Sequence, residues 1–167
     1  MSLRLALQEL LGGPCYHMEV VIRDRPDHIP LWRAAARGAS MDWAQLFEDF
    51  EAAVDWPAAR FYRELAERFP EAKVILTVRD PGGWYDSLRA TIYRMTEVSS
   101  SFPANLMLGL GGPRRHMTAM GREVVWDDPE TFAGSFPDRE GGIAVFEQHL
   151  ERVKQAIPPE RLLVYNV

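Results

Sequence analysis

Residues 73–87, KVILTVRDPGGWYDS, decide the fold of this chain. Residues 74–78 form an unbroken apolar run of strand length, rich in β-branched side chains and without polar alternation. Such runs are typical of strands that are buried on both faces of a parallel sheet. Arg79 and Asp80 follow directly, and Pro81 then begins a run of helical character. The stretch therefore predicts a strand, a tight turn and a helix.

The carboxyl end of this strand predicts a binding site for an anion. In open α/β sheets, ligands bind outside the carboxyl ends of the strands. Asp80 is a good N-cap and Pro81 a good first helical residue, so Ser87 would lie roughly 10 Å along the helix from the cap. Arg79 can reach forward and Ser87 can lean back toward the helix N-terminus, which itself favours negative charge. One phosphate group would fit between them; the alternative is an arginine paired with a local carboxylate and a serine that is merely exposed.

Asp55 is a candidate general base. It stands at a predicted helix end, directly before Trp56 and Pro57, in an otherwise apolar neighbourhood. A carboxylate whose pKa is raised there could remove a proton from an acceptor hydroxyl. The alternative is a cap for the helix that starts at Pro57, and the residues taken alone favour the cap.

Composition limits the class of protein. The 167 residues, 47% hydrophobic and 26% charged, are ordinary for a globular protein, and we expect a single domain over residues 1–167. The net charge of −5 argues against a nucleic-acid partner. No apolar run approaches the ~18 residues of a membrane span, and no secretory signal is recognisable, so the expected location is cytoplasmic, without a membrane partner.

The histidines and the cysteine predict no metal site. The four histidines show no metal-ligand spacing with each other or with Cys15. Cys15 and His17 would alternate on one face of a predicted strand, where contact between them is conceivable. A buried structural cysteine is nevertheless favoured over a nucleophile.

The rest of the chain alternates predicted helices and strands, which is typical of a doubly wound α/β sheet. Residues 99–113 are apolar but rich in helix breakers, and they predict a lid or a loop that faces the substrate. The predicted helices cover residues 2–11, 29–37, 42–54, 58–69 and 142–156, and the other predicted strands cover residues 15–22 and 161–167.

Several segments of the chain closely resemble the sulfotransferase-like family of P-loop proteins. The resemblance implies a three-layer α/β fold with a parallel sheet of the P-loop nucleoside-kinase type. It also implies that the chain binds the donor 3′-phosphoadenosine 5′-phosphosulfate and passes a sulfuryl group to an acceptor hydroxyl or amine. The segments are GGPCYHM (12–18), HIPLW (28–32), AAVDWPAARFYRELAERFPEAKVILTVRDPGGWYDS (52–87) and IPPERLLVYNV (157–167).

The resemblance also implies roles for the candidate residues. Arg79 and Ser87 match the family's contacts to the 3′-phosphate of the donor. Asp55 falls where relatives place an acidic residue that faces the acceptor. The implied catalytic residue is thus Asp55, and the implied donor-binding residues are Arg79 and Ser87.

The sequence departs from the family pattern at its start. Family members place a strand and a Gly-rich loop, roughly G-x-x-R-T-G-T, directly before a helix that resembles SLRLAL. The amides of that loop bind the donor's 5′-phosphosulfate, and here Met1 falls where the loop would end. We therefore expect a sheet that lacks its first, central strand and has a gap between the neighbours of that strand.

Two classes of function follow from these observations. The first is a sulfotransferase that uses a nucleotide donor and a small-molecule acceptor, with activity weakened or lost if the loop is missing. The second is a non-catalytic binding protein that can form a homodimer, in which exposed sheet edges attract a partner strand. An ordinary nucleotide kinase is disfavoured because no Lys-Ser or Lys-Thr phosphate loop is present.

Overall fold

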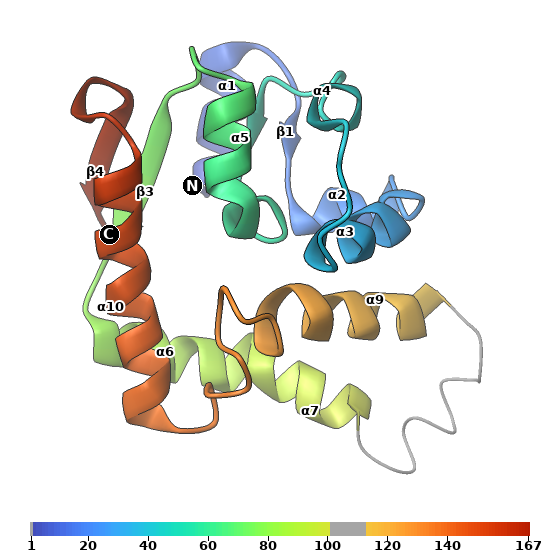
Figure 1. Ribbon diagram of the computed structural model, residues 1–167, viewed down its shortest axis with the longest axis vertical. Coiled ribbons are helices and arrows are strands. Elements are labelled where there is room, and N and C mark those ends of the chain that lie inside the picture. Colours follow the sequence, from blue (N-terminus) through green and yellow to red (C-terminus); the bar gives the residue numbers. More distant parts are fainter. Residues whose placement is uncertain (1, 101–112) are drawn as a thin grey trace.

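The computed structural model describes residues 2–100 and 113–167. Helices make up most of the structure, and the short strands lie beside them (Figure 1). Most of the predicted lid, residues 101–112, lies outside the described residues. The elements are α1 (Leu3–Leu11), β1 (Cys15–Tyr16), α2 (Met18–Arg23), α3 (His28–Ala36), α4 (Trp43–Leu46), β2 (Ala52–Ala53), a 3₁₀ turn (Ala58–Phe61), α5 (Tyr62–Arg68), β3 (Val74–Val78), α6 (Pro81–Leu88), a π-helical turn (Arg89–Tyr93), α7 (Arg94–Ser100), α9 (Pro113–Gly121), a second π-helical turn (Arg122–Trp126), α10 (Arg139–Ala156), a second 3₁₀ turn (Pro159–Arg161) and β4 (Leu162–Asn166).

The strand and the helix predicted for residues 73–87 are confirmed. β3 covers the predicted residues, and α6 begins at Pro81. The side chain of Asp80 accepts a hydrogen bond from the amide of Gly83 at 2.6 Å, so Asp80 caps α6 as expected. The prediction of burial on both faces of the strand is wrong, because Thr77 is exposed while Leu76 is buried. One face of this strand is open to solvent.

The described strands pair in parallel, but in two separate sheets. β1 pairs with β2, with Cys15 opposite Ala52, and β3 pairs with β4, with Val74 opposite Leu162. In the view of Figure 1, β1 and the β3–β4 pair lie on opposite sides of α1 and α5. The mixed α/β class with parallel strands is confirmed. The three-layer P-loop sheet, with or without its first strand, stays a prediction.

Two predicted elements are wrong in extent. The strand predicted over residues 15–22 ends at Tyr16, because the side chain of His17 accepts a hydrogen bond from the amide of Glu19 at 3.0 Å and starts α2. The helix predicted over residues 42–54 ends at Leu46, and β2 follows. The backbone bond from the Val54 amide to the Tyr16 carbonyl shows that strand pairing overrides helix propensity there.

Aromatic rings fill most of the larger core cluster. Trp32 is completely buried, and its ring centroid lies 5.5 Å from those of both Trp43 and Phe61. The indole nitrogen of Trp32 donates a hydrogen bond to the hydroxyl of Tyr16 at 2.7 Å. These contacts hold β1, α3, α4 and the turn before α5 together.

Helix α10 joins this aromatic cluster to a second, smaller one. Phe146 stacks on Trp84 of α6, with ring centroids 4.2 Å apart. Val153 packs with Leu76 and Ile157 in the smaller cluster, which covers the buried face of β3. Helix α10 therefore fixes α6 and the β3–β4 sheet relative to each other.

Candidate functional site

Arg79 and Ser87 lie at the two ends of the first two turns of α6. Arg79 directly follows β3, and both side chains are exposed. A Cβ atom added to Gly83 would lie 3.5 Å from Nη2 of Arg79, so the guanidinium reaches over the first turn of the helix. Within residues 2–100 and 113–167, Arg79 forms no ion pair. The alternative of an arginine paired with a local carboxylate therefore does not describe the structure.

A second guanidinium approaches the same turn of α6, and the sequence analysis missed it. A Cβ atom added to Gly82 would lie 3.1 Å from Nη2 of Arg139, the first residue of α10. The same nitrogen lies 3.4 Å from a carboxylate oxygen of Asp86. Arg139 is distant from α6 in sequence and follows no recognisable motif, so only the packing of α10 on α6 could reveal it.

Asp55 is paired with His17. Oδ2 of Asp55 lies 3.4 Å from Nε2 of His17. Because Nδ1 of His17 accepts the Glu19 amide hydrogen, a neutral ring carries its proton on Nε2, on the side of the carboxylate. A neutral ring thus turns its N–H side toward the carboxylate.

The pairing of β1 with β2 brings these two side chains together. Tyr16, which precedes His17, stands opposite Ala53, two residues before Asp55. The two side chains thus follow the carboxyl ends of neighbouring parallel strands, where ligands bind in α/β proteins. The closeness of Asp55 and His17 was not predicted from the sequence, because the strand predicted over residues 15–22 continues past His17.

The surroundings of Asp55 favour a proton-accepting role over capping. Burial raises the pKa of its carboxyl group, while a hydrogen bond with the Trp56 backbone and the charge of His17 act in the opposite direction. Its side chain is still 42% exposed, so a substrate can reach it. Its φ of 66° lies in the left-handed region, which Asp tolerates better than most residues. The 3₁₀ turn Ala58–Phe61 begins without a side-chain cap, so the capping alternative is not observed.

Cys15 has a structural environment. Its thiol donates to the carbonyl oxygen of Tyr16 at 3.7 Å, and burial raises its pKa. A buried thiol with a raised pKa is a poor nucleophile. The structure thus agrees with the prediction that Cys15 is a buried structural cysteine. His17 is paired with Asp55 and not with Cys15.

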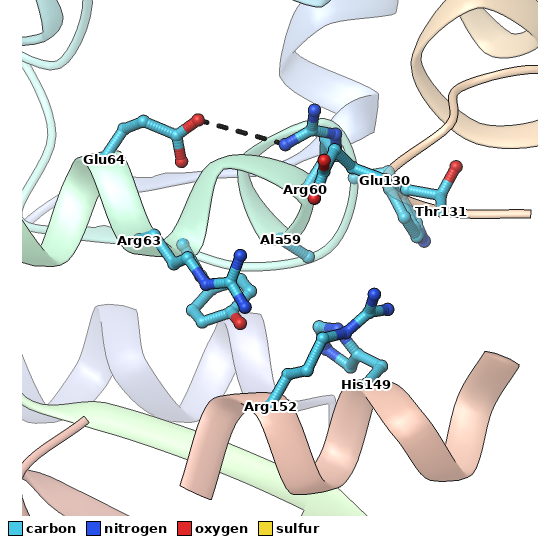
Figure 2. A pocket seen from close by; sticks show the side chains of 10 residues that line it. Ala59, Arg60, Arg63, Glu64, Glu130, Thr131, His149 and Arg152 are labelled. Atoms are coloured by element: carbon cyan, nitrogen blue, oxygen red, sulfur yellow. Dashed lines mark ion pairs between the residues drawn. The ribbon is translucent and has the colours of Figure 1, made fainter. Parts of the chain in front are cut away.

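A cavity of about 330 Å³ lies between α5 and α10 (Figure 2). We call it the α5–α10 cavity. Trp56, the neighbour of Asp55, contributes to its wall. The other lining residues are Ala59, Arg60, Tyr62, Arg63, Glu64, Glu130, Thr131, His149 and Arg152.

Across the described ranges, no group of three or more His, Cys, Asp or Glu side chains could hold a metal ion. In the same part of the chain, no helix is both long enough and apolar enough to cross a membrane.

Comparison with known proteins supports the resemblance seen in the sequence. The sulfotransferase domain family matches the chain over residues 1–167. The chain belongs to this family. It is 25% identical over 181 residues to the Ava biosynthesis cluster protein M of Aspergillus versicolor, and the match covers 99% of this chain. The chain spans 66% of the length of that relative.

Proposed function

We propose that residues 1–167 act as one sulfotransferase-type domain. The domain would take a sulfuryl group from 3′-phosphoadenosine 5′-phosphosulfate and transfer it to a hydroxyl or amine of a small-molecule acceptor. The observation that carries this proposal is the pair of Asp55 and His17 at the ends of two neighbouring parallel strands. Membership of the sulfotransferase domain family supports the reaction class.

The donor would be held at the start of α6. The guanidinium of Arg79 and the hydroxyl of Ser87 would contact its 3′-phosphate, and the guanidinium of Arg139, paired with Asp86, lies near the same turn. Bonds from charged donors to phosphate are stronger than neutral ones. The helix dipole of α6 acts in the same direction.

The acceptor would be activated by Asp55. Its carboxylate takes the proton of the acceptor hydroxyl while the acceptor oxygen attacks the sulfur atom of the donor. The new bond joins that oxygen to sulfur, and the bond between sulfur and the bridging phosphate oxygen breaks. The products are the sulfated acceptor and adenosine 3′,5′-bisphosphate. His17 would orient the carboxylate through Nε2 and is a positioning residue.

An assay of sulfuryl transfer from the donor to a panel of phenols, alcohols and amines tests this proposal. We expect Asp55→Asn to reduce kcat by about 10²–10⁴-fold, the range of general-base catalysis, because the amide cannot accept the proton. Asn also tolerates the left-handed backbone of position 55. Asp49→Asn, on an exposed residue before β2, is the matched control. Unchanged turnover in Asp55→Asn would exclude this residue as the base, and an absence of transfer to every acceptor would defeat the enzymatic proposal.

The second candidate function is non-catalytic binding through a homodimer. One observation favours it: Leu163, Val164 and Tyr165 of β4 are exposed, and β4 pairs with β3 alone among the described strands. An exposed apolar strand edge attracts another strand. Light scattering tests this candidate, because a monomer at high protein concentration would rule the homodimer out.

A further inference from the structure

The α5–α10 cavity is lined by more positive than negative side chains. Figure 2 shows Arg63 extending from α5 and both His149 and Arg152 extending from α10 on the facing side. Arg60 and two carboxylates, Glu64 and Glu130, complete the charged part of the wall. Two helices that are distant in sequence thus present cations to one cavity.

Among the described residues, two of the three arginines have no acidic partner. Nε of Arg60 lies 3.1 Å from Oδ1 of the buried Asp128, and Nη1 lies 3.9 Å from Oε1 of the exposed Glu64, so the charge of Arg60 is compensated. Arg63 and Arg152 form no ion pair in the ranges that the structure describes. Arg63 lies over the ring of Tyr62 at 5.4 Å, a contact that leaves its N–H donors available.

The cavity wall also holds a hydroxyl without a partner. The oxygen of Tyr62 is buried and forms no hydrogen bond among the described residues. Buried polar atoms are nearly always hydrogen-bonded, and a group that remains without a partner calls for an explanation. A ligand oxygen in the cavity would supply one.

The pKa of His149 depends on the positive charges in the cavity. Its ring meets that of Tyr62 edge-on, with centroids 5.5 Å apart. Burial lowers its pKa first, and the charges of Arg152 and Arg63 lower it further. The other titratable or charged groups that line the same space are Arg60 from the 3₁₀ turn, Tyr62, Arg63 and Glu64 from α5, Arg152 from α10, and Glu130 from the segment before α10. Among the described residues, neither Glu64 nor Glu130 forms an ion pair with Arg63 or Arg152.

We propose that the α5–α10 cavity binds an oxyanion of the phosphate or sulfate type between Arg63 and Arg152, with the Tyr62 hydroxyl as an additional donor. Arginine suits such a group because its planar N–H donors match two oxygens at once. The site is distinct from the start of α6. His149 follows Arg139 by ten residues, which is about 15 Å along α10.

Sulfate is the probe that tests this proposal, because its charge stays constant where histidine titrates. The ring protons of His149 are followed by NMR, with assignment by His149→Gln, while sodium sulfate replaces sodium chloride at constant ionic strength. We expect a saturable shift and a rise in the pKa of His149, because a bound anion offsets the two arginines. Sulfate affinity should accordingly fall as the pH rises through that pKa, since the proton on His149 is then lost.

Variants locate the bound ion. Arg63→Gln and Arg152→Gln should each weaken sulfate binding by about tenfold or more, the effect of one charge-assisted hydrogen bond. Arg68→Gln, on the same helix as Arg63 but outside this cavity, is the matched control and should bind like the parent chain. Circular dichroism establishes that each variant is folded. Tighter binding of phenyl phosphate than of inorganic phosphate would identify an organic ligand as the source of the oxyanion, whereas equal binding would identify the free ion.

Three results would overturn the proposal. They are a non-saturable shift, a shift that chloride produces equally, and equal sulfate affinity in the parent chain and both arginine variants. Loss of sulfate binding in Arg79→Ala, with Arg63→Gln unaffected, would move the ion to the start of α6 and would also overturn it. Because the readout needs no sulfuryl transfer, this proposal and the proposed function can fail independently.

Discussion

At the scale of single residues, the behaviour of Asp55 depends on His17. The base acts in its ionised form, so the rate of transfer should rise with pH through the pKa of Asp55, which burial holds above 3.8. The charge of His17 lowers that pKa. We expect His17→Gln to shift the rising limb of kcat/KM to higher pH, with little loss of rate on the plateau, where Asp55 is ionised in both proteins.

The control for this shift is His116→Gln, which alters an exposed histidine on α9. Its pH profile should match that of the parent chain. An unchanged midpoint in His17→Gln, or a shift to lower pH, would show that His17 does not act on the carboxylate.

The second prediction at this scale concerns the role of Arg79 in nucleotide binding. The chain should bind adenosine 3′,5′-bisphosphate more tightly than adenosine 5′-monophosphate, because a charged bond to the 3′-phosphate contributes about 1.5–3 kcal/mol. Arg79→Ala should abolish the preference, and Ser87→Ala should reduce it less because a neutral donor is lost. Calorimetry measures both, with Arg94→Ala, an exposed arginine of α7, as the control. If Arg79→Ala still discriminates between the nucleotides, the stretch around it has a structural role alone.

At the scale of elements, a carboxylate clamp joins α3 to the turn after α9. Glu123 accepts hydrogen bonds from Arg33 at 2.6 and 2.9 Å and from Arg37 at 2.9 Å. The bonds with Arg33, and less strongly those with Arg37, hold the pKa of Glu123 below its ordinary value of 4.5. The clamp therefore stabilises the folded chain above that value and weakens as the pH falls through the lower, folded-state pKa.

We expect Glu123→Gln to lower the free energy of unfolding by about 1 kcal/mol at neutral pH, as for a bidentate, partly buried pair. The difference from the parent chain should vanish in acid, where the parent's own carboxylate is protonated. Urea unfolding across pH measures it. Glu151→Gln breaks an exposed pair with Lys154 and should cost almost nothing. A loss that persists unchanged in acid would contradict the ionic account.

The same scale shows what a single sequence can predict. The β3 strand and the α6 helix were predictable because their signals are local: an apolar run, a cap and a proline. The extents of β1 and α4 were not, since the side chain of His17 starts α2 directly after β1, and the pairing of β2 with β1 replaces the end of the helix predicted over residues 42–54. The pair of Asp55 and His17 depends on that pairing, and the cavity depends on the packing of two helices that are distant in sequence.

At the scale of the whole molecule, the two sheets rest on cores of unequal size. The β1–β2 sheet borders the large aromatic cluster, while three fully buried side chains, Leu76, Val153 and Ile157, form the centre of the cluster at β3. Regions with few buried apolar contacts open first in hydrogen exchange. The β3–β4 sheet should therefore be the more sensitive to changes in its core.

We expect Val153→Ala to cost about 2 kcal/mol, from two lost methyl groups and the resulting cavity. The amides of β3 and β4 should lose protection against hydrogen exchange while those of α3 keep it. Val167→Ala, at an exposed position, is the control. Equal loss of protection in α3 would show that the molecule unfolds as one cooperative unit.

The stack of Trp84 on Phe146 has an optical consequence. Trp84 belongs to the first turn of α6, so its indole emission should respond to a nucleotide that arrives beside Arg79. Trp56 lines the α5–α10 cavity and should respond to an ion bound there. The chain has five tryptophans, so each region is identified by loss of response: Trp84→Phe should remove the emission change caused by the nucleotide, and Trp56→Phe should remove the change caused by the ion, without any label.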